Sequence, residues 1–536
     1  MPEAQPQRVS TRATGIVGIA VLCSRILGLV REQVFAGLFG ATRNLDIFLI
    51  AFRVPNLLRD LFAEGALSTA FITTFSKKIA TEGDRSAWEL ANKVATLTAI
   101  FMSAVTIVGI IFSHQIIGVI GRGFNADDQA MTTLLTQIMW PFILLVSLAA
   151  LAMGMLNAKH VFGMPAMAST FFNVGSIIAG VAVGWWLDPQ FGQRALLGLA
   201  IGTLVGGALQ FLVQVPALWR VGYRFRPNFI WRDPGVRTIL VLMGPAVIAA
   251  SAVQVNVLVN STFASYLAKG AVAWLSIAFR LMQLPLGIFG VAVATVALPL
   301  VSKSAAVGDI AGFRSALAHG IRVVFLLTIP SAVGLFCLAD PIIAVIYQHG
   351  RFTPEATRQT AAALQFYAIG LAAYSGVKVI APAFYALDRR YLPMAVSIFS
   401  IITNLILNWF FTFHLGFGHR GLALSVSVVA IINFLLLYMM MLRYAGPLET
   451  GALFGLLAKL LIPLALLAGV CLLALATMFY PGAHLPEWQK VFGVLLTISV
   501  AAVVFFGSAF LFRVNEVRDV VDLVRRKFGR RNQPSA

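Results

Sequence analysis

Residues 421–442 read GLALSVSVVAIINFLLLYMMML, a run without a charged side chain that is bounded by Arg420 and Arg443. A helix of about 20 mainly apolar residues spans the hydrocarbon core of a bilayer, so this run predicts a transmembrane helix. Similar runs fill the chain, in which 59% of the 536 residues are hydrophobic and 11% are charged. Soluble domains have roughly 45–50% apolar and about 25% charged residues. The composition therefore excludes a soluble protein and a protein with a single membrane anchor.

Apolar runs of membrane length, separated by short connections, predict an all-α polytopic membrane protein with about fourteen transmembrane helices. The runs lie at 14–40, 45–75, 93–113, 131–156, 163–187, 194–219, 237–268, 271–302, 317–338, 358–385, 392–415, 420–443, 453–480 and 488–512. An even number of spans puts both ends of the chain on the same side of the membrane.

The basic residues in the connections predict which side this is, because connections rich in Lys and Arg stay in the cytoplasm. One set of connections holds Arg8, Arg12, Lys77, Lys78, Arg85, Lys159, Arg220, Arg224, Arg226, Arg232, Lys303, Arg314, Arg389, Arg390, Arg443 and the basic tail. The opposite set holds only Arg43, Arg122, Arg194, Lys269, Arg351, Arg358, Arg420 and Lys490. We therefore expect both termini in the cytoplasm. Most of the net charge of +19 serves this purpose, and the tail is expected to face anionic lipid rather than nucleic acid.

An internal repeat predicts two related halves. A shift of 227 residues aligns IAFR at 50–53 with IAFR at 277–280, and one further residue of shift aligns Phe124 with Phe352. Matches in order at a nearly constant offset indicate two copies of a six-span unit with the same membrane orientation. The expected parts are a cytoplasmic N-terminus at 1–13, an N-lobe at 14–222, a pseudo-symmetric C-lobe at 237–444, a C-terminal helix pair at 453–512 and a basic cytoplasmic tail at 513–536.

Charged side chains inside the expected spans are candidates for function, because such residues usually face a protein interior or a watery cavity. The basic ones are Arg25 and Arg31 on the first run, Arg53 and Arg59 on the second, Arg280 on the eighth and Lys378 on the tenth. Arg25 and Glu32, and likewise Arg53 and Asp60, are seven residues apart and share a helix face. Arg31, Arg59 and Arg280 lack such a partner and are the best candidates for cations that line a cavity. Alternatively, the arginines snorkel from span ends or pair across helices.

Guanidinium groups bind phosphate oxygens two at a time and stay charged when dehydrated. The arginines therefore predict a cargo with a phosphate or pyrophosphate group. The chain has no His-Glu-x-x-His spacing and no glycine-rich phosphate loop, so we expect no metal site, no cofactor and no enzyme activity. Gly28, Gly37 and Gly40 on the first run predict either a bent, gate-like span or close helix packing.

Several short blocks resemble the signature of a known family. They are SRILG at 24–28, Arg31 with Glu32, Asp46, RVPNLLRDLFAEGA at 53–66, FRLM at 279–282, HGRFT at 349–353 and VKVIAP at 377–382. Together they resemble the MurJ (MviN) family of the multidrug/oligosaccharidyl-lipid/polysaccharide exporter superfamily.

The resemblance implies a flippase of the bacterial inner membrane that takes part in cell-wall biogenesis. Its substrate would be lipid II, the undecaprenyl-pyrophosphate-linked muropeptide, moved from the cytoplasmic to the periplasmic leaflet by alternating access through a cationic cavity. The last helix pair would hold the lipid tail, and membrane lipids and cell-wall synthesis and division proteins are the implied partners. The family pattern puts substrate binding on Arg25, Arg31, Asp46, Arg59 and Arg280, with Ser24, Arg53, Asn56 and Glu64 in support. Lys378 is added to the supporting set for its depth in the membrane.

Two alternatives stay open at this point: an exporter of another polyprenyl-linked oligosaccharide or of drugs, and a scaffold for cell-wall enzymes without transport. Drug antiporters of this architecture usually favour intramembrane acids, whereas the charges here are mainly basic. Some relatives are thought to bind sodium through acids on the seventh, eleventh and twelfth spans. Those spans carry Asn256, Asn404 and Asn408 here, so we expect no sodium site.

Overall fold

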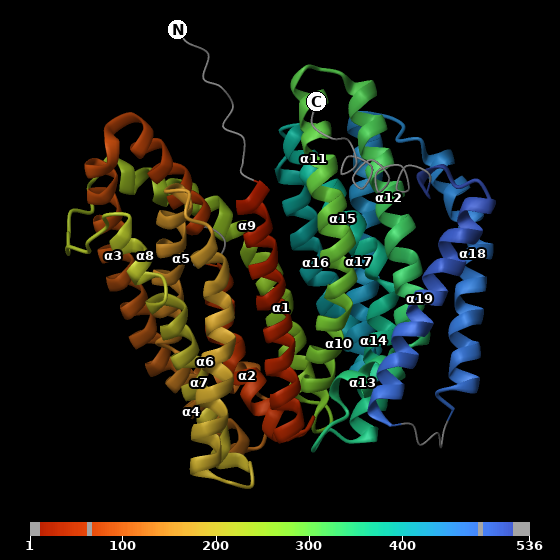
Figure 1. The fold of residues 1–536 in the computed structure, drawn as a ribbon, viewed down its shortest axis with the longest axis horizontal. Helices are drawn as coiled ribbons and strands as arrows, with labels where there is room; N and C mark the ends of the chain where they lie inside the picture. The colour runs from red at the N-terminus through yellow and green to blue at the C-terminus, as the bar shows by residue number, and fades with distance from the viewer. Residues whose placement is uncertain (1–10, 62–66, 481–485, 518–536) are drawn as a thin grey trace. The chain divides into compact units, whose positions relative to one another are not determined.

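The computed structural model describes residues 11–61, 67–480 and 486–517, and every regular element in these ranges is helical (Figure 1). Among the described residues, ten helices are long and apolar enough to cross a membrane. The number is eleven if Pro354–Ile369 and Leu371–Ala386, which meet at a bend of 43°, form one span. The all-helical membrane fold is therefore confirmed, whereas the total of about fourteen spans stays a prediction.

The chain forms two compact units. The first comprises residues 1–273 and 349–352, the second residues 274–348 and 353–536. Described helices of the first unit are α1 (Thr11–Phe39), α2 (Arg43–Leu58), α3 (Ser68–Ile120), α4 (Ala126–Met139), α5 (Phe142–Ala158), α6 (Gly163–Leu187), η2 (Gln193–Ala195), α7 (Leu196–Leu212), α8 (Val215–Arg220) and α9 (Pro234–Ser265). Those that follow are α10 (Ala271–Pro285), η3 (Leu286–Gly290), α11 (Val291–Ala306), α12 (Ile310–Cys337), α13 (Ala339–Tyr347), α14 (Pro354–Ile369), α15 (Leu371–Ala386), α16 (Tyr391–Trp409), η4 (Phe410–His414), α17 (His419–Ala445), α18 (Thr450–Thr477) and α19 (Glu487–Leu511).

Helix α9, which we expected to open the C-lobe, packs within the first unit. The ammonium group of Lys93 on α3 lies 2.7 Å from the carboxylate of Asp233, the residue that caps the start of α9. At the other end of α9, the hydroxyl of Ser265 accepts a hydrogen bond from the backbone N–H of Gly123 (3.1 Å). The first compact unit thus extends to residue 273, beyond residue 237 where we expected the C-lobe to begin. The pseudo-symmetry of the two lobes stays a prediction.

Helix α1 shows which of the two expected effects of its glycines holds. The helix runs without a break from Thr11 to Phe39. A Cβ atom at Gly28 would meet only the side chain of Asn173, at 3.7 Å, so this glycine lies where α1 packs against α6. Gly40 follows the helix with a φ of +64°, and a Cβ there would lie 2.6 Å from the carbonyl oxygen of Arg351. A close approach and a positive φ explain Gly40, and α1 is not broken at Gly28 or Gly37.

The run expected at 45–75 is not one helix. Helix α2 ends at Leu58, a π-helical turn covers residues 59–61, and α3 begins at Ser68. Helix α3 then continues to Ile120 and is kinked at Gly83, whose φ is +82°. The apolar pattern does not distinguish a connection that stays helical from one that breaks.

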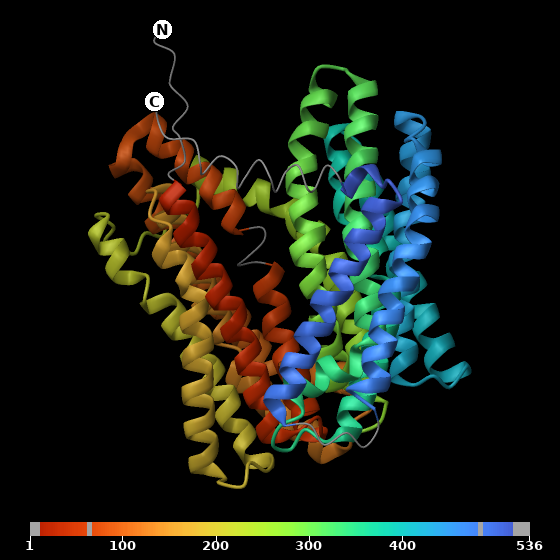
Figure 2. The same ribbon diagram turned by 45° about the vertical axis from the view of Figure 1, so that its right-hand side comes forward.

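Each unit has its own apolar core. In the first unit, buried residues of α3, α5, α8 and α9 pack together, with Phe75 and Leu90 completely buried. In the second unit, α12, α15 and α17 surround Phe313 and Phe384. The pair α18 and α19, drawn in blue, lies side by side in both ribbon views and packs on α12 through a separate cluster that includes Phe505 (Figures 1 and 2).

The Asp233 cap gives a stability test. Burial alone would raise the pKa of Asp233, but hydrogen bonds from Lys93 and from the backbone N–H of Gly235 lower it below its ordinary value. The carboxylate therefore stabilises the fold fully above the unfolded pKa of about 3.9 and progressively less as the pH falls through the folded value. Asn caps a helix as well as Asp does, but Asp233→Asn removes the charge that faces Lys93, so we expect it to cost up to about 1 kcal/mol at neutral pH, measured by thermal unfolding in detergent. The difference from wild type should shrink below about pH 4; a difference that is independent of pH would contradict this account.

Candidate functional site

The candidate site begins on α1, which carries Arg25, Arg31 and the supporting residue Ser24. The amide of Asn173 on α6 donates hydrogen bonds to the backbone oxygens of Ser24 (3.2 Å) and Ser169 (3.1 Å). One to two turns further along α1, the guanidinium carbon of Arg31 lies 5.1 Å from the ring centre of Phe172. This cation–π contact orients Arg31, which is half-buried, without neutralising its charge. Arg25 is exposed on the same helix.

Helix α2 carries Arg53 and Asn56, both half-buried, and Arg59 follows as the first residue after it. Our expectation that Arg59 lacks an acidic partner was wrong. Its guanidinium lies 3.0 Å from a carboxylate oxygen of Asp60, and the second oxygen of Asp60 accepts a longer hydrogen bond (3.4 Å) from Gln254 of α9. Side chains of adjacent residues in an α-helix diverge by about 100°, but here both residues lie in the π-helical turn that follows α2.

Asp46, the second residue of the run expected at 45–75, is completely buried near the start of α2. Its two carboxylate oxygens accept hydrogen bonds from the backbone N–H groups of Gly270 (2.6 Å) and Ala273 (2.9 Å). These donors lie where α10 begins, so Asp46 acts as a cap for the free N–H groups of that helix end. The role that the geometry shows for Asp46 is structural, and its contact with a substrate stays a prediction.

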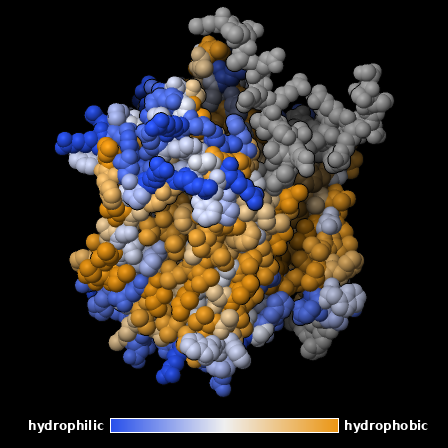
Figure 3. All heavy atoms as spheres, turned by 60° about the vertical axis from the view of Figure 1, so that its left-hand side comes forward, coloured by the Kyte–Doolittle hydropathy of each residue, from blue (hydrophilic) through white to orange (hydrophobic). Residues whose placement is uncertain are grey.

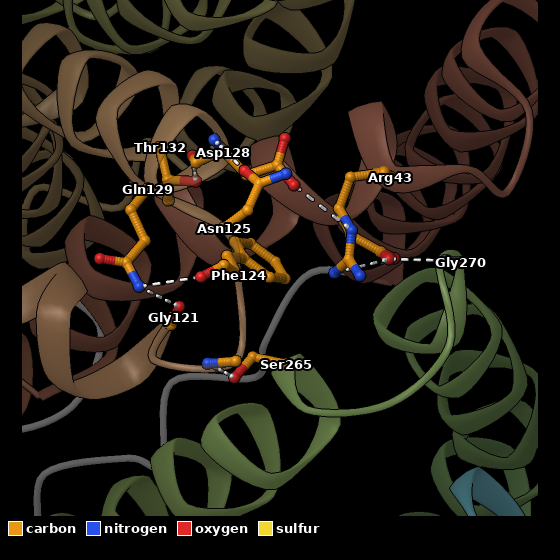
Figure 4. Close-up of polar contacts among 11 residues, drawn as sticks. Arg43, Gly121, Phe124, Asn125, Asp128, Gln129, Thr132, Ser265 and Gly270 are labelled. Carbon is orange, nitrogen blue, oxygen red and sulfur yellow. Dashed lines mark hydrogen bonds and ion pairs between the residues drawn. The ribbon is translucent and has the colours of Figure 1, made fainter.

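Arg43 lies between Asp46 and a second acid, Asp128, and Figure 4 shows Arg43 and Asp128. Its guanidinium lies 3.9 Å from Asp46 and 3.7 Å from Asp128 of α4, and its carbon lies 4.6 Å from the ring centre of Phe124. The side chain of Arg43 is only 17% exposed. Its positive charge is therefore balanced by two carboxylates at a largely buried position. We expected Arg43 in a connection, and its spacing of three residues from Asp46 is the sequence signal for their contact.

In the second unit, Arg280 on α10 and Lys378 on α15 are both exposed. Helix α10 continues from the segment that Asp46 caps, and a π-helical turn, η3, follows it directly. On α16, the side-chain amide of buried Asn408 donates a hydrogen bond to the side-chain oxygen of buried Asn404 (3.0 Å). Within the described ranges, no group of three or more His, Cys, Asp or Glu side chains could hold a metal ion.

Most of the predicted residues thus lie on α1, on α2 or directly after α2, all in the first unit. Residues 24–60 contain five arginines and three acids, a net charge of +2. Glu64, one of the predicted supporting residues, lies outside the described residues. What these residues offer chemically is guanidinium groups that can bind an anion, and two of them, Arg31 and Arg59, are oriented by neighbouring side chains.

The sequence matches the model of a protein family described as "Lipid II flippase MurJ" over residues 35–487. A probable lipid II flippase MurJ of Rickettsia prowazekii is 32% identical over 93% of this chain and 97% of its own length. The lipid II flippase MurJ of Burkholderia cenocepacia is 37% identical over 80% of this chain and 83% of its own.

Solved structures show the same likeness. A lipid II flippase MurJ in an inward closed conformation matches with a TM-score of 0.73 and 26% sequence identity, covering 92% of this chain and 99% of that one. An inward-facing multidrug resistance MATE family transporter matches with a TM-score of 0.68, covering 80% and 96%. Its sequence identity is only 13%, so it shares the fold and no more.

Proposed function

Since this chain belongs to the MurJ family of lipid II flippases, we propose that it moves lipid II from the cytoplasmic to the periplasmic leaflet. The chain is a multi-pass protein of a bacterial inner membrane. The observation that carries the proposal is the set of arginines on α1 and α2, above all Arg31, which Phe172 orients and leaves charged. A half-buried guanidinium in an apolar helix fits a pyrophosphate that must leave water.

In this proposal, the pyrophosphate binds to Arg25, Arg31, Arg59 and Arg280, while the prenyl chain stays in lipid along α18 and α19. Asp60 offsets part of the positive charge of Arg59. Rocking of the two units about the bound headgroup would give alternating access, with both termini in the cytoplasm. No covalent bond changes in this step, which agrees with relatives that are named as flippases and not as enzymes. Cell-wall synthesis and division proteins are the proposed partners.

A leaflet-resolved assay of lipid II tests the function. Cells depleted of the protein are treated with a lipid II-cleaving enzyme that cannot cross the inner membrane, and the cleaved fraction is measured. We expect lipid II to accumulate uncleaved, because it stays in the cytoplasmic leaflet, and growth to stop. An unchanged cleaved fraction would favour a scaffold without transport. Accumulation of a different polyprenyl-linked sugar would favour the other exporter.

A further inference from the structure

The connection between α8 and α9 carries aromatic and basic side chains in alternation. Residues 219–232 read WRVGYRFRPNFIWR, with four arginines and no acid. Trp219, Phe225, Phe229 and Trp231 are 54, 53, 66 and 62% exposed, and the four arginines are exposed as well. Large apolar side chains gathered in this way on a surface usually mark an interaction site.

The segment is held rigidly on α3. The backbone N–H of Arg226 donates to the side chain of Asn92 (3.1 Å), and that of Asn228 donates to the hydroxyl of Thr96 (3.0 Å). Tyr223 is buried and its ring packs against that of Trp88, with centres 5.3 Å apart. The exposed aromatic rings therefore stand on a fixed backbone, which lowers the entropy lost when they bind a partner.

Residues 219–232 are attached to α3 at one end of an apolar, outward-facing surface of that helix. From Ile100 onward, α3 exposes large apolar side chains, including Phe101 (51%) and Ile107 (58%). Thr96 precedes Ile100 by four residues, about 6 Å along a helix axis at 1.5 Å per residue. On the face drawn in Figure 3, hydrophilic residues lie above and below a broad apolar area. Aromatic side chains concentrate at such boundaries, where one end of the ring is apolar and the other is wet.

Two of the arginines are positioned by neighbouring rings. The guanidinium carbon of Arg224 lies 5.4 Å from the ring centre of Trp219, and that of Arg232 lies 4.9 Å from that of Trp231. Such contacts keep the charge and leave the N–H groups able to bind phosphate oxygens. We propose that residues 219–232 form a docking surface for the headgroups of anionic phospholipids. A bilayer is favoured over nucleic acid because the segment adjoins the lipid-facing surface of α3.

The test uses the full chain in detergent and measures lipids retained in native mass spectrometry as phosphatidylglycerol or phosphatidylcholine is added. We expect phosphatidylglycerol to bind at least roughly tenfold tighter than phosphatidylcholine, and Arg224→Gln/Arg226→Gln to abolish most of this preference, since each arginine at a membrane surface is worth severalfold in affinity. Lys77→Gln/Arg85→Gln removes the same charge from the same expected side of the membrane and should keep the preference. Phe229→Ser/Trp231→Ser should weaken the binding of phosphatidylglycerol and of phosphatidylcholine to the same extent.

Three results would overturn the proposal. One is equal binding of the two lipids by the wild-type chain, and another is the same loss in both charge-removing double variants. The third is a single-stranded RNA that displaces phosphatidylglycerol and depends on Arg224 and Arg226, which would make the surface a nucleic-acid site. All four substituted basic residues are exposed, so we expect the charge-removing variants to fold. Thermal unfolding that matches the wild type verifies this for each variant.

Discussion

An Arg31→Glu variant is expected to lose almost all transport of lipid II. The substitution replaces a half-buried cation beside Phe172 with a carboxylate, which repels a pyrophosphate instead of binding it. A hydrogen bond to a charged group contributes about 1.5–3 kcal/mol, and repulsion adds to the loss, so a decrease of about 100-fold or more is expected. The measurement is the fraction of lipid II cleaved from the periplasmic side in cells that depend on the variant.

Two matched variants separate charge from shape. Arg31→Lys keeps the charge but loses the planar group over Phe172, and should retain part of the activity. Arg194→Glu reverses an exposed arginine in the connection before α7 and should behave as wild type. Arg280→Glu should fail like Arg31→Glu. If Arg31→Glu or Arg280→Glu, at wild-type protein levels, supports normal growth and normal periplasmic exposure of lipid II, the substituted arginine has no part in the mechanism.

The sequence predicts the helices well because apolar runs reflect contact with lipid, which is a local property. The run expected at 163–187 and helix α6 have the same bounds. The sequence predicts poorly where a helix ends or kinks. The end of α2 at Leu58 and the kink at Gly83 within α3 are not marked by the apolar pattern. The assignment of α9 to the first unit depends on Lys93, which is 140 residues away from its partner Asp233.

The candidate site was predictable as a set of residues and not as a set of contacts. Depth in an apolar run was enough to select Arg31, Arg53 and Arg280, because charge in that position is rarely accidental. The pair of Arg59 and Asp60 lies in a π-helical turn that no sequence pattern marked. The backbone donors that occupy Asp46 lie 224 and 227 residues along the chain, beyond the reach of any local rule.

An Asp46→Ala variant is expected to be strongly destabilised. The carboxylate is completely buried, accepts hydrogen bonds from Gly270 and Ala273, and lies 3.9 Å from the guanidinium of Arg43. Removing it leaves two backbone N–H groups without their acceptor and takes one of two acids away from a cation that is 17% exposed. Loss of one member of a buried pair costs about 3–5 kcal/mol, measured by thermal or chemical unfolding of the purified protein in detergent.

The control variants decide whether Asp46 is structural or binds substrate. Asp46→Asn keeps one acceptor oxygen but not the charge, so its loss of stability should be intermediate. Asp127→Ala removes an exposed acid and should change stability by less than about 0.5 kcal/mol. If capping and pairing are the role, Arg43→Met should recover part of the stability lost in Asp46→Ala, because it removes the cation left with one acid. A stable Asp46→Ala protein that fails only in lipid II transport would instead assign Asp46 to substrate binding.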